Sequence, residues 1–294
     1  MLKQNLTLAL AAIALPCGAL AEEAVTPSSD EIVIADLRLT TVDIAGLRPV
    51  AEEDVSVSVT VMSAEDLAVR AAPYVADQLR AVPGVGVSRS GAVGGLTQVR
   101  IRGGEANHTL VLLDGIEVSD PTTGETDFGL WSGLNVERIE VARGEQSALY
   151  GSDAIGGVVA MTTGGEGLTG ALEGGSFDSV RADLGYRREI GDGYVSIALS
   201  SNATDGVDTS GKGGERDGSK ARAAFANGGW TISPNWQVSA LASYRESEVQ
   251  TDPDLDFDGQ LDNANRETDS EQWLVGGVLE GTSGPVSHIL RASL

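Results

Sequence analysis

From residue 167 to the C-terminus, apolar and polar residues alternate in one short segment after another. Alternation with a period of two is the pattern of a β-strand with one apolar and one polar face. It is plainest in Val180–Tyr186, Val195–Leu199, Ala221–Phe225 and Trp236–Tyr244. About seven such segments fit between residues 167 and 294, and this number makes an antiparallel sheet the expected fold of this part.

The connections between these segments alternate in length. Tight turns are expected at Gly191–Gly193, Ser233–Asn235 and Ser283–Pro285, and long linkers at 201–219 and 246–270. Short turns on one side and long loops on the other are typical of an outer-membrane β-barrel, with apolar residues outward and polar residues inward. A soluble β-sandwich alternates in the same way and stays open as the alternative.

The N-terminus has the pattern of a secretory signal peptide. Lys3 provides a positive charge, Leu6–Leu15 is apolar, and Ala19–Ala21 fits a small-residue cleavage site. The apolar run is about half of the roughly 20 residues that a membrane-spanning helix needs. We therefore expect residues 1–21 to be removed, with a lipid anchor on Cys17 as a weaker alternative because Pro16 precedes it.

Composition excludes several function classes. Cys17 is the only cysteine, so cleavage leaves a chain without disulfides, thiol nucleophiles or cysteine-ligated metals. The formal charge is -23, and removing Lys3 with the signal peptide makes it -24. Nucleic-acid binding needs clustered Lys and Arg, so no nucleic-acid partner is expected.

Residues 50–165 predict a different fold. Val55 to Val61 alternate as a strand should, and Ser63–Asp66 forms a capping box at the start of a short helix. A second helix is expected from Pro73 through Val75, Leu79 and Val82 to Pro83-Gly84. Further strands are expected at 98–102, 109–113 and 136–141. Together these segments predict an α+β domain, a small mixed sheet with short helices.

Three motifs in this region carry a family resemblance: Ile101–Gly104, Leu112–Gly115 and Glu145–Thr163. In this order they resemble the plug domain of TonB-dependent outer-membrane receptors, most closely the vitamin B12 (cobalamin) transporter branch, over residues 30–165. The resemblance implies an α+β plug domain followed by antiparallel transmembrane β-barrel strands. We expect a signal peptide at 1–21, a flexible N-terminal segment at 22–49, the plug at 50–165 and the first barrel strands at 166–294. Family barrels have many more strands, so the barrel is expected to be incomplete.

The resemblance also implies a function and a location. It implies TonB-dependent active transport across the outer membrane of a Gram-negative bacterium, energised by TonB with ExbB/ExbD and surrounded by outer-membrane lipid. Cobalamin is the expected substrate, a ferric siderophore is the alternative, and a truncated plug-type binding or signalling module is a third reading. Plug loops near 88–96 and 119–130 are expected to face the substrate. No catalytic constellation surrounds His108 or His288, so we expect no enzyme and no covalent cofactor.

A short β-prone stretch follows Asp30. Its residues Glu31, Ile32, Val33, Ile34 and Ala35 resemble a TonB box, the segment that the TonB protein grips. An extended peptide can pair with an exposed sheet edge through backbone hydrogen bonds, and this pairing can carry a pull. Residues 32–34 could equally be the first strand of the plug.

Two arginines precede glycines in the motifs that carry the resemblance. A plug inside a barrel buries a polar interface where charges have to be paired or hydrated. We therefore expect Arg102 and Arg143 to form ion pairs between plug and barrel. The alternative is that both arginines form solvated ion pairs at the surface, each of which contributes less than about 1 kcal/mol to stability.

The longest expected outer loop is rich in aspartate. Asp254, Asp256 and Asp258 with Gly259 repeat the opening of a calcium-binding loop, although Asn265 replaces the usual closing glutamate. Calcium prefers six to eight oxygen ligands, and alternate carboxylates can supply several. We expect a calcium site at residues 252–262, with a solvated acidic loop as the alternative. Its candidate ligands are Asp252, Asp254, Asp256, Asp258 and Asp262.

Overall fold

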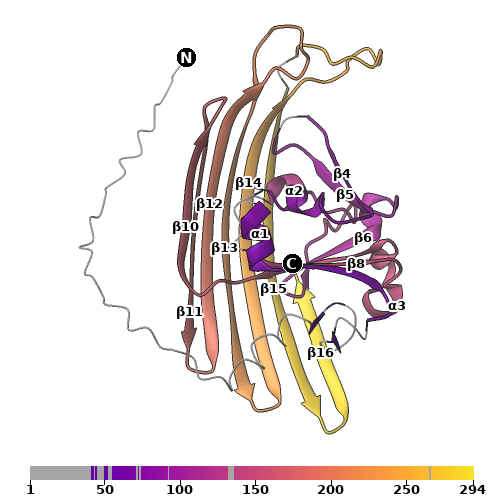
Figure 1. Ribbon diagram of the computed structural model, residues 1–294, viewed down its shortest axis with the longest axis vertical. Helices are drawn as coiled ribbons and strands as arrows, with labels where there is room; N and C mark the ends of the chain where they lie inside the picture. Colours follow the sequence, from indigo (N-terminus) through magenta and orange to yellow (C-terminus); the bar gives the residue numbers. More distant parts are fainter. Residues whose placement is uncertain are drawn as a thin grey trace, which may run out of the picture. The chain divides into compact units, whose positions relative to one another are not determined.

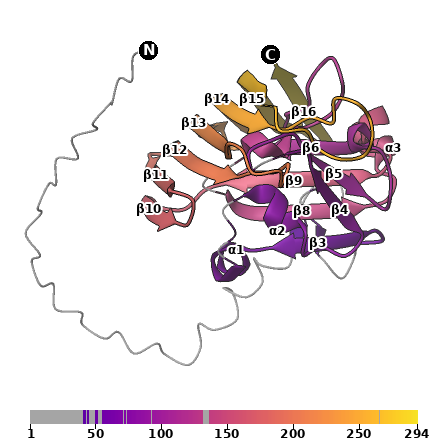
Figure 2. The same cartoon turned by 90° about the horizontal axis from the view of Figure 1, so that it is seen from above.

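The computed structural model describes residues 41–42, 44, 50–51, 55–70, 72, 74–91, 93–131, 136–264 and 266–294. The predicted signal peptide and TonB box lie outside these residues. The described part contains a small α+β plug and a long antiparallel sheet, which we call the wall (Figures 1 and 2). Within this part, no helix has both the length and the apolar character needed to cross a membrane.

The plug is built on a five-stranded mixed sheet with the order β3-β8-β9-β6-β7. Its central strands β6 and β9 pair in parallel and its other neighbours pair antiparallel. Two short two-stranded sheets, β1-β2 and β4-β5, accompany it. The strands are β1 (Thr41–Val42), β2 (Val50–Ala51), β3 (Ser58–Met62), β4 (Val85–Arg89), β5 (Thr97–Ile101), β6 (Thr109–Leu113), β7 (Ile116–Glu117), β8 (Val136–Arg143) and β9 (Gly157–Thr163). The small mixed sheet predicted from the sequence is confirmed.

Short helices join these strands: α1 (Ala64–Arg70), α2 (Val75–Leu79) and α3 (Ser147–Tyr150), with single turns of 3-10 helix at Ala106–His108, Phe128–Leu130 and Ser152–Ala154. The predicted capping box is present before α1, because the hydroxyl and N–H of Ser63 donate to Asp66 Oδ2 and the N–H of Asp66 donates to Ser63 Oγ. Helix α2 is shorter than predicted. Val82 lies in the turn that follows it and donates its N–H to the carbonyl of Leu79.

The wall consists of seven antiparallel strands in sequence order, and it does not close into a barrel. Tight turns at residues 191–192, 234–235 and 284–285 join alternate pairs, as predicted. The strands are β10 (Gly167–Gly175), β11 (Ser179–Ile190), β12 (Gly193–Val207), β13 (Asp217–Ser233), β14 (Trp236–Thr251), β15 (Arg266–Ser283) and β16 (Val286–Ser293).

The outer connections are shorter than predicted. Linkers were expected at 201–219 and 246–270, but the strands continue into these segments and leave loops at 208–216 and 252–265. The polar ends of the strands still pair because ladder hydrogen bonds need only backbone groups. Opposite charges across β13 and β14 support the pairing, with Lys220–Glu248 at 3.0 Å and Arg222–Glu246 at 3.1 Å.

The plug packs on the inner face of the wall. One buried apolar cluster contains Leu113 and Ile139 from the plug together with Phe225 and Leu241 from the wall. The outer face instead exposes large apolar side chains, including Leu172, Leu184, Ile197, Trp273 and Leu290. No second sheet among the described elements covers that face, which distinguishes the wall from the sandwich alternative.

The plug core gives a stability prediction. Leu113 is fully buried in β6, so Leu113→Ala should lower the free energy of unfolding by about 2–5 kcal/mol through lost contacts and the cavity left behind. Urea unfolding followed by tryptophan fluorescence measures the change. The matched substitution Leu96→Ala, at a half-exposed site, should stay within about 0.5 kcal/mol of the unchanged chain. Equal losses at the two sites would contradict the observed core.

Candidate functional site

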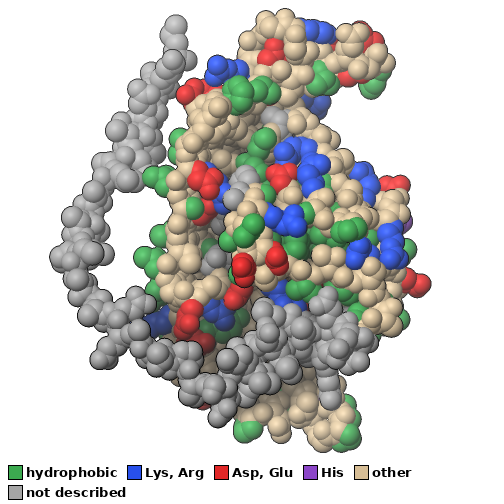
Figure 3. All heavy atoms as spheres, in the orientation of Figure 1, with side chains coloured by type: hydrophobic (Ala, Val, Ile, Leu, Met, Phe, Trp, Pro, Cys, Tyr) green, Lys and Arg blue, Asp and Glu red, His purple; other side chains and the backbone are tan. Residues whose placement is uncertain are grey.

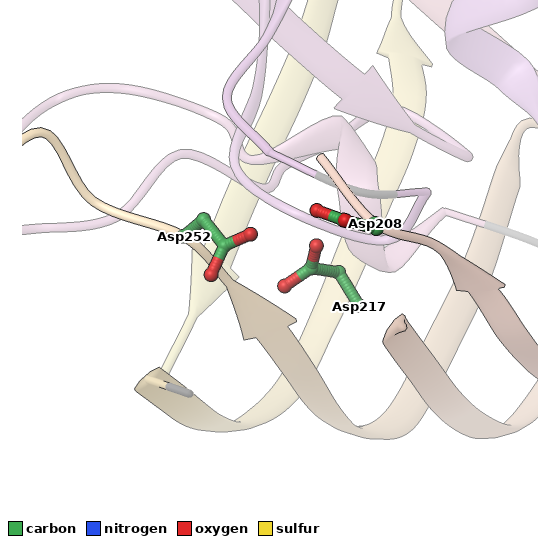
Figure 4. Close-up of side chains that lie close together, drawn as sticks. All are labelled: Asp208, Asp217 and Asp252. Atoms are coloured by element: carbon green, nitrogen blue, oxygen red, sulfur yellow. The ribbon is translucent and has the colours of Figure 1, made fainter. Parts of the chain in front are cut away.

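Two clusters of aspartates lie at the loop end of the wall, where β12 connects to β13 and β14 to β15. In each cluster, carboxylate oxygens from three residues come within 4.8 Å of one another. The first cluster contains Asp208, Asp217 and Asp252, and the second contains Asp254, Asp256 and Asp262. Figure 4 shows the three carboxylates of the first cluster turned toward one another. Asp208 precedes β13, Asp217 begins it, and Asp252 directly follows β14.

The first cluster is buried at its centre. Asp217 is 0% exposed and Asp252 is 5% exposed. Asp217 Oδ2 accepts hydrogen bonds from the N–H and the hydroxyl of Thr209, both at 2.7 Å. Its Oδ1 has no hydrogen-bond partner among the described residues. Leaving a buried carboxylate oxygen without a donor costs free energy. This oxygen is therefore a candidate for binding an ion or a ligand.

Asp252 ties both outer loops together. Its Oδ2 accepts from the N–H of Ser210 at 3.0 Å, and its Oδ1 accepts from the N–H of Ala264 at 3.0 Å. Ser210 belongs to the first outer loop and Ala264 to the second. One carboxylate at the end of β14 therefore fixes the two loops relative to each other.

Asp208 is held in its ionised form. It accepts hydrogen bonds from the hydroxyl of Ser210 and from the N–H groups of Gly211, Gly213 and Gly214. These bonds, led by that from Ser210, lower the pKa of Asp208 to about 2. Hydrogen bonds to a carboxylate favour its charged form.

The second cluster is formed by a tight loop at 252–262. Asp254 accepts from the N–H groups of Asp258 and Gly259, whose φ of 86° favours glycine. Asp262 accepts from the N–H of Leu255 at 3.0 Å and from Lys212 Nζ at 3.0 Å, and both bonds lower its pKa. Lys212 comes from the other outer loop, so this cluster also bridges the loops.

The five predicted calcium ligands do not form one site in the structure. It assigns Asp252 to the first cluster, places Asp254, Asp256 and Asp262 in the second, and leaves Asp258 outside both. Asp258 Oδ1 instead accepts from the N–H of Gln260. Asp208 and Asp217 were not predicted as ligands from the sequence. The only signal for them was an acidic, glycine-rich stretch at 205–218, which matches no linear metal motif.

The predicted substrate-facing loop 88–96 lies beside the first cluster. A Cβ on Gly91 would stand 2.6 Å from Cγ2 of Thr251, the residue before Asp252. A Cβ on Gly94 would stand 3.3 Å from Ser219, two residues after Asp217. The plug loop therefore packs against the two strand ends that carry the buried carboxylates.

The second predicted loop, 119–130, is anchored both to the plug and to the wall. Asp127 accepts from the N–H groups of Thr97 and Gly129, and burial raises the pKa of its carboxyl. At the end of this loop the ring of Trp131 lies 3.8 Å from the guanidinium carbon of Arg245, a fully buried residue of β14. Such a cation–π contact holds the loop against the wall.

Arg102 and Arg143 occupy different environments from each other. Figure 3 shows Lys and Arg side chains gathered over the plug. Arg143 donates to the carbonyl of Pro83 at 2.7 Å and to the hydroxyl of Thr60 at 3.0 Å, both within the plug. Arg102 is exposed and has a left-handed backbone with φ 53°. Neither forms an ion pair within the described part of the chain. Their pairing with the barrel stays a prediction.

Comparison with known proteins gives concordant results. Residues 51–158 match the TonB-dependent Receptor Plug Domain family. The chain is 32% identical to the vitamin B12 transporter BtuB of Photobacterium profundum over 264 residues, which is 86% of this chain and 41% of that protein. It is 26% identical to the vitamin B12 transporter BtuB of Vibrio vulnificus strain YJ016, covering 95% of this chain and 44% of that protein. The chain thus spans less than half the length of these relatives.

Solved structures share the fold. The ferric enterobactin receptor PfeA of Pseudomonas aeruginosa superposes with a TM-score of 0.62 at 22% identity, over 80% of this chain and 40% of that one. The receptor FpvA of the same organism, bound to a ferric pyoverdine, superposes with a TM-score of 0.63 at 17% identity. The match covers 83% of this chain and 34% of that one. The described part of the chain therefore shares its fold with part of these receptors.

The hydrogen bonds to Asp208 predict how this loop responds to acid. The folded-state pKa of Asp208 is lowered to about 2, whereas the pKa of an aspartate in the unfolded chain is 3.8. The stability that Asp208 contributes is therefore fully present above pH 3.8. It is lost as the pH falls from there through about 2. Titration of the Asp208 carboxyl carbon by NMR should show this low midpoint, and Ser210→Ala should raise it. The distant control Ser201→Ala should leave it unchanged. A midpoint near 3.8 in the unchanged chain would contradict the hydrogen bonds.

Proposed function

Because the chain has the plug domain of the TonB-dependent receptors and an unclosed sheet that matches part of their barrel, we propose that it belongs to an outer-membrane transporter that takes up cobalamin. The observation that carries this proposal is the plug domain packed on the inner face of an unclosed antiparallel sheet. Substrate would bind where plug loop 88–96 meets the outer loops of the wall. The architecture belongs to a transporter and receptor family rather than to an enzyme family.

The choice of cobalamin over a ferric siderophore is supported by the relatives. The protein of Photobacterium profundum that is 32% identical is a vitamin B12 transporter. The siderophore receptors are similar in fold at 22% and 17% identity, and this level of identity supports shared architecture alone. A ferric siderophore is therefore the second candidate.

Energy for transport would come from the inner membrane. In this proposal TonB, energised by ExbB/ExbD, pairs with Glu31–Ala35 as an added strand. The backbone hydrogen bonds of that pairing carry the pull to the plug. A plug held to the wall by limited polar contacts can then move and open a path, an order–disorder type of switch.

The two aspartate clusters are proposed to hold calcium. Asp208, Asp217 and Asp252 would bind one ion, and Asp254, Asp256 and Asp262 a second. The buried Asp217 Oδ1, which lacks a partner among the described residues, fits a metal ligand. Carboxylate oxygens are the ligands that calcium prefers. A bound ion would supply positive charge that offsets the repulsion among the carboxylates.

Ion binding would order the surface that meets the substrate. Asp252 contacts both outer loops, and Asp262 accepts from Lys212 across them. Fixing these side chains would hold both loops against plug loop 88–96. The substrate surface would then be formed before the substrate arrives, which lowers the ordering cost of binding.

Calcium binding can be tested with a control taken from the same loop. Asp217→Asn removes a buried ligand charge and should weaken calcium binding about tenfold or more, since ligand charge sets affinity in such sites. Asp258→Asn removes an equal charge outside both clusters and should change the affinity less than about twofold. Isothermal titration calorimetry with calcium alone gives both values. No binding by the unchanged chain, or equal weakening by the two variants, would overturn the calcium proposal.

Transport can be tested in cells that express the complete product of this gene. Ile34→Pro removes a backbone N–H from the proposed TonB box and should reduce uptake of labelled cobalamin more than about tenfold, while cobalamin binding is retained. Ser29→Pro, outside the box, is the matched control and should transport normally. Uptake of a ferric siderophore in place of cobalamin would support the second candidate. Uptake that Ile34→Pro leaves unchanged would contradict the proposed TonB box.

A further inference from the structure

The motif Leu112–Gly115 ends in a turn with an unusual backbone. Asp114 and Gly115 connect β6 to β7 with φ values of 47° and 79°. Two consecutive left-handed residues form the hairpin turn in which Asp-Gly is favoured. The turn explains why glycine follows, but it does not require an aspartate side chain at 114. The side-chain contacts of Asp114 therefore indicate a second role.

Asp114 connects the plug to the wall. Its Oδ1 accepts from the N–H of Thr163 at 2.9 Å, and its Oδ2 accepts from the hydroxyl of Thr163 at 2.6 Å. Oδ2 also accepts from Asn227 Nδ2 at 2.9 Å, and the same amide donates to Thr163 Oγ1 at 3.0 Å. Thr163 ends β9 of the plug, whereas Asn227 lies on β13 of the wall.

These polar groups are removed from solvent. Thr163 is 3% exposed and Asn227 is 7% exposed. Burial raises the pKa of the Asp114 carboxyl, while the bonds from Thr163 and Asn227 and the nearby charge of Arg187 act in the opposite direction. Arg187, on β11, donates to the carbonyl of Thr163 at 3.5 Å. Moving the plug away from the wall would remove the Asn227 donor from this carboxylate, and hydrogen bonds to a charged acceptor are stronger than neutral ones.

The connection lies beside the covalent junction of plug and wall. Thr163 is followed by Gly164, Gly165, Glu166 and Gly167, where β10 begins. Gly165 and Gly167 have φ values of 106° and 85°. Glycines accommodate large backbone changes with little strain, so residues 164–167 have the composition of a hinge.

Arg187 also contacts the plug at this junction, through the carbonyl of Thr163, whereas two other polar contacts between plug and wall are farther away. Asn202 donates to the hydroxyl of Tyr74, and Arg245 stacks on Trp131. Both wall residues lie in the half of their strands nearest the outer loops, whereas Asn227 lies in the half nearest the tight turns. The Asp114 contact, together with that of Arg187, is thus placed to control rotation about residues 164–167.

We infer that Asp114, Thr163 and Asn227 form a lock on the hinge at residues 164–167, and that this lock has to open before the plug can swing away from the wall. The inference rests on the proposed function, because it assigns the lock to the plug movement of transport. Apolar plug–wall contacts can slide, since they are non-directional. The lock resists rotation because its hydrogen bonds are directional.

A cysteine under the plug reports opening. Ala198 lies on β12, is 4% exposed and packs in the cluster shared by plug and wall. Ala198→Cys in the complete gene product, in outer-membrane vesicles with mild urea, would react with a maleimide only when the plug moves away. Within residues 1–294, the only native cysteine is Cys17, which lies in the predicted signal peptide.

Exchanging the two partners provides the decisive comparison. Asn227→Asp sets a second carboxylate against Asp114 and should speed labelling about tenfold. The double variant Asp114→Asn with Asn227→Asp restores one donor and one acceptor across the interface and should return to within about twofold of the reporter alone. Ser196→Ala changes the cross-strand neighbour of Asn227 and should have no effect.

Two results would overturn the lock: labelling by Asn227→Asp at the unchanged rate, or equally fast labelling by the single and double variants. If Asn227→Asp does not assemble, judged by heat-modifiable migration on gels, Asn227→Ala replaces it. This variant should label at least about threefold faster than Ser196→Ala, and equal rates would refute the lock. Because the readout needs no substrate, a wrong choice of cobalamin leaves the result intact.

Discussion

The contact between the plug core and the inner face of the wall is the interaction on which the other features depend. Phe225 and Leu241 on the wall belong to the same buried cluster as Leu113 and Ile139 in the plug. Burial of this apolar surface holds the plug against the wall, so that polar groups around the cluster are close enough to form hydrogen bonds. Without it, neither the plug loop beside Asp217 and Asp252 nor the bond from Asn227 to Asp114 could form.

The two ends of the interface have different chemistry. At the loop end, carboxylates are concentrated around a buried oxygen of Asp217 that has no donor among the described residues. At the turn end, Thr163 and Asn227 donate three hydrogen bonds to Asp114, while Oδ1 of Asn227 has no hydrogen-bond partner among the described residues. The loop end therefore concentrates carboxylates next to the proposed substrate surface, whereas the turn end carries directional hydrogen bonds between plug and wall next to a glycine-rich junction.

Much of the local structure was predictable because it depends on neighbouring residues. The capping box at Ser63–Asp66 and the three tight turns of the wall were confirmed. The ends of the long strands were not predictable from apolar alternation, because pairs such as Lys220–Glu248 extend the ladder where alternation ends. Asp208 and Asp217 were missed because the relevant neighbour, Asp252, is contributed by a different loop.

The sequence alone determined the α+β plug motifs, the period-two strands and an acidic outer loop, since each of these is encoded within a few consecutive residues. Only the tertiary structure decided which carboxylates share a cluster and which plug residue meets the wall. Asp217 and Asp252 come together through the register of β13 with β14, and Asp114 reaches Asn227 across 113 positions. Contacts between residues so far apart in the sequence depend on how the sheets pack. A pattern of neighbouring residues does not encode that packing.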